Sequence, residues 1–358
     1  MSTEIQKIAS RIHDYELRFE TSFSFLNQFV QLDAVFYVID KTVFNLYKEQ
    51  FFFLEDKENV FYIEAKEENK TLQYAEIIID KFLTLQPNKK TTLVSIGGGI
   101  TQDLTGFVAS TFYRGMHWIY VPTTLLAQAD SCMGSKTSLN YKSFKNILGT
   151  FYPPHQVMVC AKFIESLTND DYYSGMGEVV KLHTMAGIES LDNLIQHLPQ
   201  IHKRNNLTIQ QLIKESLRIK WTYIENDEFD TGKRNMLNYG HCFGHAIETG
   251  TNYKIPHGQA VIMGMILANY AATQKEILTQ RVFEKTNLVF FDLLRTNFKQ
   301  VRLIDADLLL NAMKQDKKRS GKHLPLILLN DSFEFTKILD FTEEEARQAI
   351  EWFINSYC

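Results

Sequence analysis

The chain has 358 residues, enough for two domains, and its 45% hydrophobic and 22% charged residues are typical of an ordinary globular protein. A formal net charge of −4 excludes the strongly basic surface with which proteins bind nucleic acid, and no apolar run is long enough to span a membrane. The N-terminal residues lack the apolar core of a secretory signal, and the four cysteines form no CxxC pair. We therefore expect a cytoplasmic protein with reduced thiols.

Short β-rich runs alternate with helical patterns in the first part of the chain. Strands are expected at 34–40, 59–65, 91–99 and 117–124, and helices at 67–82 and 102–115. Strands that alternate with helices indicate a mostly parallel sheet with helices on its faces.

The pattern changes after Pro153 and Pro154. Apolar residues then recur at helical spacing over 171–198, 207–226, 235–250, 257–275, 283–297 and 343–356. No flexible linker or internal repeat is present. The expected α/β fold is a Rossmann-like parallel-sheet domain over residues 1–155 and an all-helical domain over 156–358, with the active site in the cleft.

Three glycines, Gly97, Gly98 and Gly99, follow the strand expected at 91–99, and Asp103 follows them on a helical pattern. Glycines at this point allow the backbone amides of a helix N-terminus to approach a pyrophosphate. The spacing is GGGxxxD and not GxGxxG, and a tight structural turn would use the same residues. The spacing alone leaves both interpretations open.

Two histidines, His241 and His245, lie four residues apart on a helical pattern and therefore share one face, and His257 follows a turn. Imidazoles that converge in this way suit a zinc ion with an open coordination position. Two core or capping histidines and one surface histidine explain the spacing equally well. The glutamate of an HExxH motif is absent, which disfavours a metalloprotease.

A carboxylate ligand would have to come from another segment. Glu178 is the candidate, because its helical pattern is largely apolar and Lys181 follows one turn later. The alternative is an i, i+3 surface ion pair worth a few tenths of a kcal/mol. Other basic residues near expected element ends could bind phosphate and carboxylate groups, although each alone is more simply a solvated charge. They are Lys136, Lys145, Lys220, Arg234 and the run 317–319.

In this order, the motifs resemble those of 3-dehydroquinate synthase and other sugar phosphate cyclases. The resemblance spans residues 35–330 and is carried by GGGITQDLTGFVASTFYRG (97–115), VPTTLLAQADSCMGSKTSLN (121–140), FKNILGTFYPP (144–154), GMGEVVK (175–181), RNMLNYGHCFGHAIE (234–248), HGQAVIMGM (257–265) and MKQDKK (313–318). It implies an enzyme of the shikimate pathway that uses NAD and zinc, or cobalt or another divalent metal.

The resemblance also assigns site residues. The implied metal ligands are Glu178, His241 and His257, whereas His245 would transfer protons or orient the substrate. The implied NAD contacts are Asp40, Glu67, Lys70, Gly97, Gly98, Gly99, Asp103, Thr123 and Thr124. The other residues implied to line the substrate are Asp130, Lys136, Lys181, Lys220, Arg234 and Asn238. The implied phosphate contacts are Lys145, Asn146, Lys317 (or Lys318) and Arg114, the last from a neighbouring subunit of a homodimer.

The implied reaction converts a 3-deoxy-heptulosonate 7-phosphate into the carbocycle 3-dehydroquinate. NAD oxidises a hydroxyl group of the substrate, phosphate is eliminated, the hydride returns, and an intramolecular aldol reaction closes the ring. Three positions depart from the family pattern: Ser135 replaces a glycine, Gln259 a glutamate and Cys160 an aspartate.

These departures leave room for other functions. One is a specialised cyclase that acts on a neutral sugar phosphate, as 2-deoxy-scyllo-inosose synthase does. Others are a metal-dependent polyol dehydrogenase and a non-catalytic binding protein. Lys220 and Arg234 match residues expected to hold a substrate carboxylate, and they therefore favour the acidic heptulosonate.

Overall fold

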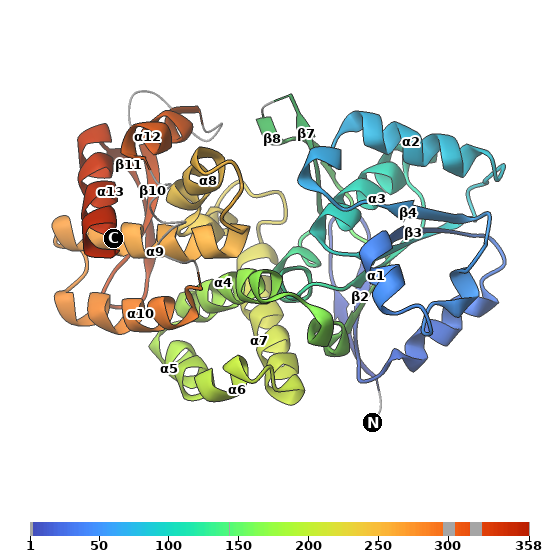
Figure 1. Ribbon diagram of the computed structural model, residues 1–358, viewed down its shortest axis with the longest axis horizontal. Helices are drawn as coiled ribbons and strands as arrows, with labels where there is room; N and C mark the ends of the chain where they lie inside the picture. The colour runs from blue at the N-terminus through green and yellow to red at the C-terminus, as the bar shows by residue number, and fades with distance from the viewer. Residues whose placement is uncertain (1–2, 143, 296–304, 316–323, 358) are drawn as a thin grey trace. The chain divides into compact units, whose positions relative to one another are not determined.

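The computed structural model describes residues 3–142, 144–295, 305–315 and 324–357 (Figure 1). The chain divides into two compact units. Unit 1 comprises Met1–Leu167 and Ile224–Phe229, and unit 2 comprises Thr168–Tyr223 and Asp230–Cys358. Unit 1 continues beyond residue 155 because β9 (Gln156–Cys160) pairs with two strands of its sheet.

Within the described residues, unit 1 is built on a seven-stranded sheet. The strand order is β1 (Glu4–Ile8), β2 (Tyr15–Glu20), β9, β6 (Trp118–Pro122), β5 (Thr92–Gly97), β3 (Val35–Asp40) and β4 (Val60–Ile63). Neighbouring strands are parallel except β1 and β2. The four expected strands correspond to β3, β4, β5 and β6. Strands β3 and β6 are almost continuously buried, as parallel strands covered on both faces require.

Helices and short turns connect these strands. They are α1 (Lys41–Leu46), α2 (Leu72–Leu83), α3 (Gly99–Thr111), η1 (Phe23–Gln31), η2 (Phe52–Leu54), η3 (Glu67–Asn69), η4 (Phe112–Arg114), η5 (Ala127–Ser131) and η6 (Ala161–Ser166). A separate antiparallel hairpin, β7 (Lys136–Tyr141) and β8 (Phe144–Phe151), sets Lys136 opposite Phe151. A buried core that includes Phe29, Ile39 and Val94 fixes the sheet.

Unit 2 is mainly helical. Its elements are α4 (Asn169–Met185), α5 (Ile188–Gln196), α6 (Leu198–His202), α7 (Asn206–Ile224), η7 (Lys233–Asn238), α8 (His241–Gly250), α9 (His257–Gln274), α10 (Gln280–Leu293), α12 (Ala306–Gln315), β10 (Leu324–Leu329), β11 (Phe335–Phe341) and α13 (Glu343–Tyr357). The helical pattern over 171–198 is broken at Gly187, whose φ of +104° ends α4 and allows α5 to begin.

The expectation of an all-helical second domain is wrong for one hairpin. Strands β10 and β11 pair antiparallel, and the LPLILL segment of β10 is largely buried and packs against α9. A short continuous apolar run of this kind fits a buried strand as well as a helix. The described residues contain no helix that is both long and apolar enough to cross a membrane.

Candidate metal and cofactor sites

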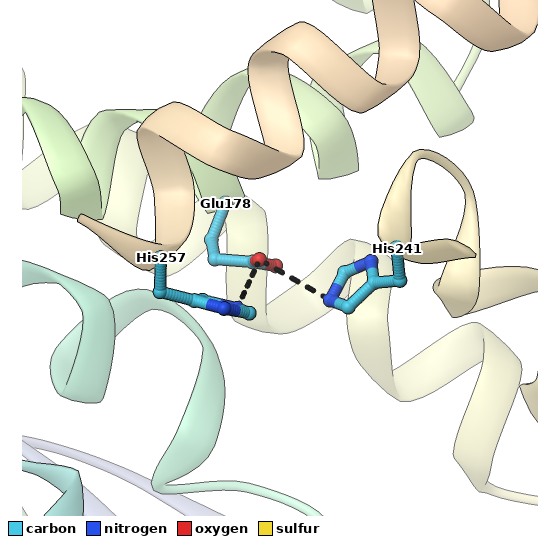
Figure 2. A group of neighbouring side chains, drawn as sticks. All are labelled: Glu178, His241 and His257. Atoms are coloured by element: carbon cyan, nitrogen blue, oxygen red, sulfur yellow. Dashed lines mark ion pairs between the residues drawn. The ribbon is translucent and has the colours of Figure 1, made fainter. Parts of the chain in front are cut away.

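Three side chains converge in unit 2 (Figure 2). Glu178 lies in α4, and His241 and His257 are the first residues of α8 and α9. Glu178 Oε1 is 3.5 Å from His241 Nε2 and 3.3 Å from His257 Nε2, and one ligand atom of each residue lies within 4.8 Å of the others. This separation is short enough for one ion to contact all three.

Glycines beside the three residues allow their helices to approach closely. A Cβ atom at Gly177 would collide with the carbonyl oxygen of Gly258, and one at Gly258 would collide with the carbonyl oxygen of Ser174. These contacts bring α4 against α9 at the residues next to Glu178 and His257. Gly240, which precedes His241, has a φ of +77°, so the chain can turn sharply into α8.

The Nδ1 atoms of His241 and His257, which face away from Glu178, both have hydrogen-bond partners. His241 Nδ1 lies 3.1 Å from the carbonyl oxygen of Tyr239, and His257 Nδ1 lies 2.9 Å from Glu248 Oε2. Since a carbonyl or carboxylate oxygen accepts, Nδ1 carries the proton in each ring and Nε2 faces Glu178. This arrangement is typical of histidines that bind a metal through Nε2.

The charges of the cluster also suit a cation. Glu178 is buried, and Lys181 Nζ lies 2.5 Å from its Oε2. Burial raises the pKa of Glu178, but Lys181, His241 and His257 together hold it well below its usual range. Burial and Lys181 lower the pKa of His241, which is therefore neutral. Burial also lowers the pKa of His257, but Glu248 and Glu178 outweigh it and raise the value to about 10.

An anionic carboxylate and two imidazoles are the donor set of a catalytic zinc site, with a coordination position left for substrate or water. A metal would displace the proton from His257 Nε2, so metal binding would release a proton. The residues present therefore fit the metal that the sequence resemblance implies.

The sequence interpretation missed Glu248. Together with His245 and His257 it forms a second group whose ligand atoms lie within 4.8 Å of one another. The signal was available, because Glu248 follows His245 by three residues and His241 by seven, which places all three on one face of α8. The ring of His245 lies perpendicular to that of His241, with the ring centroids 5.3 Å apart.

The basic residues expected at the substrate in unit 2 are buried. Lys181, Lys220 and Arg234 are 2%, 6% and 4% exposed. Buried cations are costly unless an anion accompanies them, and Lys181 has Glu178. Asn238, in η7, donates from Nδ2 to the carbonyl oxygen of Asn235. Lys317 and Lys318 lie outside the described residues.

In unit 1, the three glycines lie where β5 ends and α3 begins. Gly98 occupies the N-cap position of α3, and as a glycine it has no side chain with which to cap the first amides of this helix. The amide of Thr123 donates to the carbonyl oxygen of Gly97 at 3.0 Å. The buried hydroxyl of Thr123 has no hydrogen-bond partner within the described residues. An uncapped helix N-terminus beside such a hydroxyl fits an anionic, hydrogen-bonding cofactor such as NAD.

Residues expected at the cofactor and at the substrate phosphate meet in unit 1. Lys70 Nζ lies 2.5 Å from Asp103 Oδ2 and 2.7 Å from Asn146 Oδ1. Glu67 Oε1 lies 3.7 Å from Lys145 Nζ. The two groups of residues are thus linked by direct contacts, a proximity that their separation in the sequence does not indicate.

The remaining expected residues of unit 1 have varied positions. Asp40 caps α1 by accepting a hydrogen bond from the amide of Thr42 at 2.7 Å. Thr124 Oγ1 accepts from the amide of Ala127, and Asp130 is half-buried in η5. Lys136 and Arg114 are exposed, at the start of β7 and the end of η4.

Comparison with known proteins relates both halves of the chain to one family. Residues 60–174 match the model of the 3-dehydroquinate synthase N-terminal family, and residues 175–319 that of the 3-dehydroquinate synthase C-terminal family. A 3-dehydroquinate synthase of Streptococcus equi subsp. equi is 35% identical over 334 residues, which cover 91% of this chain and 92% of that protein. One of Clostridium tetani is 30% identical over 358 residues, with 99% and 92% covered.

Solved structures share the fold. A 2-epi-5-epi-valiolone synthase of Streptomyces hygroscopicus, solved with NAD+ and Zn2+, has a TM-score of 0.82 at 21% identity and covers 99% of this chain and 100% of its own. A 2-deoxy-scyllo-inosose synthase, solved with carbaglucose-6-phosphate, NAD+ and Co2+, has a TM-score of 0.80 at 20% identity, with 97% and 99% covered. A glycerol dehydrogenase of Schizosaccharomyces pombe is more distant, with a TM-score of 0.61 at 13% identity and coverage of 94% and 88%.

Proposed function

Because the chain belongs to the 3-dehydroquinate synthase family, we propose that it converts a 3-deoxy-heptulosonate 7-phosphate into 3-dehydroquinate with release of phosphate. The reaction class is that of a phosphorus–oxygen lyase. The observation that carries the proposal is the convergence of Glu178, His241 and His257 from three helices on one point of unit 2. Relatives that are 30–35% identical over most of the chain are 3-dehydroquinate synthases.

NAD and a divalent metal, zinc or cobalt, are the proposed cofactors. The solved cyclases contain NAD+ with Zn2+ or Co2+, and the donor groups of this chain fit both kinds of ligand. When bound, NAD takes up and returns a hydride, and the metal polarises a hydroxyl group. Glu178, His241 and His257 would hold the metal. The proposed NAD contacts are Asp40, Glu67, Lys70, Gly97, Gly98, Gly99, Asp103, Thr123 and Thr124.

The proposed substrate contacts divide by charge. Lys220 and Arg234 would pair with the substrate carboxylate, because both are buried cations. The guanidinium group of Arg234 can bind a carboxylate in a bidentate manner. His245, beside His241 and His257, would accept and return a proton. Asp130, Lys136, Lys181 and Asn238 would line the rest of the substrate. Lys145, Asn146 and Lys317 would bind its phosphate, together with Arg114 of the second subunit of a homodimer.

One assay tests the proposal and its rivals. Purified protein with zinc and a catalytic amount of NAD is offered the heptulosonate 7-phosphate and glucose 6-phosphate in parallel, and phosphate release and product mass are followed. We expect phosphate from the acid through many turnovers, with no NADH accumulating. Stoichiometric NADH would indicate a dehydrogenase, and turnover of glucose 6-phosphate alone would indicate a specialised cyclase.

A further inference from the structure

Glu248 connects the two helices that carry the histidines of the metal site. Glu248 is 6% exposed and belongs to α8, whereas the ring that it contacts belongs to His257 at the start of α9. The turn between these helices is closed by hydrogen bonds, among them one from the amide of Tyr253 to the carbonyl oxygen of Glu248 at 2.7 Å. The same residue therefore holds the turn with its backbone and the ring with its side chain.

The two histidines are oriented by different kinds of partner. His241 Nδ1 faces a backbone carbonyl, that of Tyr239, which no substitution removes. His257 Nδ1 faces a side chain, so its orientation depends on the identity of residue 248. The ring of His257 is also the more exposed of the two, with 32% of its side chain accessible against 13% for His241. Less surrounding protein thus fixes its rotamer.

We propose that Glu248 is a positioning residue for the metal site: by accepting a hydrogen bond from His257 Nδ1–H, it holds the Nε2 atom of His257 toward Glu178, where a metal would take the place of the Nε2 proton. The inference rests on the proposed function, because it takes Glu178, His241 and His257 as metal ligands. A carboxylate on the far nitrogen fixes the tautomer and ring orientation and makes the ligating nitrogen more basic. Loss of such a partner lowers metal affinity by about 10- to 100-fold.

The test compares zinc affinity and histidine tautomer in three variants. Glu248→Ala removes the acceptor, and Glu248→Gln keeps an amide oxygen that can still accept from Nδ1–H. Glu345→Ala is the matched control, because it also removes a glutamate of unit 2, one whose Oε1 pairs with Lys275 Nζ at 2.6 Å. Zinc dissociation constants are measured with a competing chelator, and side-chain ¹⁵N spectra of the metal-free proteins report which nitrogen of His257 carries a proton. Circular dichroism establishes that each variant is folded.

We expect Glu248→Ala to bind zinc about 10- to 100-fold more weakly than the wild type, Glu248→Gln to lie between them, and Glu345→Ala to match the wild type. The Nδ1–H signal of His257 should persist in Glu248→Gln and be lost in Glu248→Ala.

Unchanged zinc affinity in both Glu248 variants, with normal zinc binding by the wild type, would overturn the positioning role but not the proposed function. A wild type that binds no zinc would instead overturn the metal part of the proposed function. A zinc stoichiometry that falls from two to one in Glu248→Gln would show that Glu248 is itself a ligand, of a second site with His245 and His257, and would also overturn the positioning role.

Discussion

Ser135 Oγ donates a hydrogen bond of 2.5 Å to Glu228 Oε1, and both side chains are buried. Glu228 also accepts from Ser10 Oγ at 2.7 Å and from the amide of Arg11 at 2.8 Å. Ser135 has a φ of +65°, a conformation that favours glycine, which is the residue the family pattern has here. The serine therefore offsets its backbone strain with a charge-assisted hydrogen bond.

Replacing Ser135 tests this compensation. Ser135→Ala keeps the strained φ and removes one donor from a buried carboxylate, so we expect unfolding to require about 1–3 kcal/mol less free energy. Ser135→Gly relieves the strain and should lose less. Urea unfolding measures both. In the Glu228→Gln background, the cost of Ser135→Ala should shrink, and equal costs in the two backgrounds would show that the pair is not coupled.

A second prediction concerns the close packing beside the ligands. In Gly258→Ala, the new Cβ would collide with the backbone of Ser174, so α9 must shift relative to α4. We expect a loss of about 1–3 kcal/mol or more in the free energy of unfolding, together with weaker zinc binding. Gly99→Ala is the control, because among the described residues its Cβ would meet only Ser131 Oγ, at 3.7 Å. If both variants unfolded alike, the proposed role of the close crossing would be wrong.

Metal content tests the ligands themselves. His257→Ala should leave the protein folded but without stoichiometric zinc, because two ligands rarely hold the ion against a chelator. His197→Ala, which removes a ring whose Nδ1 lies 2.7 Å from the carbonyl oxygen of Asn193 in α5, should retain the metal. Elemental analysis after dialysis distinguishes them. Equal metal content in the two variants would contradict the assignment of His257.

The fourth prediction concerns the charge of the substrate. In Arg234→Met a buried cation is lost, and loss of one member of a buried charge pair typically costs 2–5 kcal/mol. At about 1.4 kcal/mol per tenfold change, kcat/KM for the heptulosonate should fall by roughly 30- to several thousand-fold. Zinc and NAD binding should remain, as titration of each would show. An equal fall for a neutral sugar phosphate would mean that Arg234 does not pair with the carboxylate.

The sequence predicts the centre of the sheet well and its edges poorly. Strands β3 and β6 are runs of buried apolar residues, which have a recognisable pattern. Strand β1 is mostly exposed, and its sequence EIQKI carries little signal, so pairing with β2 is decided by tertiary contacts. The β10 run LPLILL fits more than one kind of element until its partner is known.

Spacing alone does not select the metal ligands. His241 and His245 share a helix face, and local spacing favours both, but the position of His257 depends on how the turn before α9 returns the chain. The choice of His257 over His245 as the second histidine ligand came from the resemblance to the family. The contact of His257 with Glu248 was not predicted, because it depends on the same turn.

The departure at Gln259 has a packing explanation that only the structure provides. Gln259 is buried, and its amide nitrogen donates to the carbonyl oxygens of Tyr173 and Leu293, while its amide oxygen accepts from the amide of Arg295. A glutamate could accept from Arg295 but could not donate to two carbonyl groups. In this chain the residue type follows from its backbone neighbours.

The last prediction concerns pH and a histidine outside the metal site. His183 lies on α4, is fully buried, and its Nδ1 lies 3.0 Å from Ser190 Oγ. Burial lowers its pKa from 6.5 to about 4, although the nearby Glu215 opposes this shift. As pH falls below about 6.5 the unfolded chain binds a proton at this residue, but the folded protein does not do so until about pH 4. Stability from neutral His183 is therefore complete above pH 6.5 and decreases toward pH 4, by about 1.4 kcal/mol per pH unit within that window.

Free energies of unfolding of the metal-free protein, measured between pH 4 and 8 for the wild type and His183→Gln, give this contribution as a difference in which the other titrating groups cancel. The gap between the two curves should narrow or reverse in sign as the pH falls through the window. Parallel curves would show that His183 does not titrate with a lowered pKa.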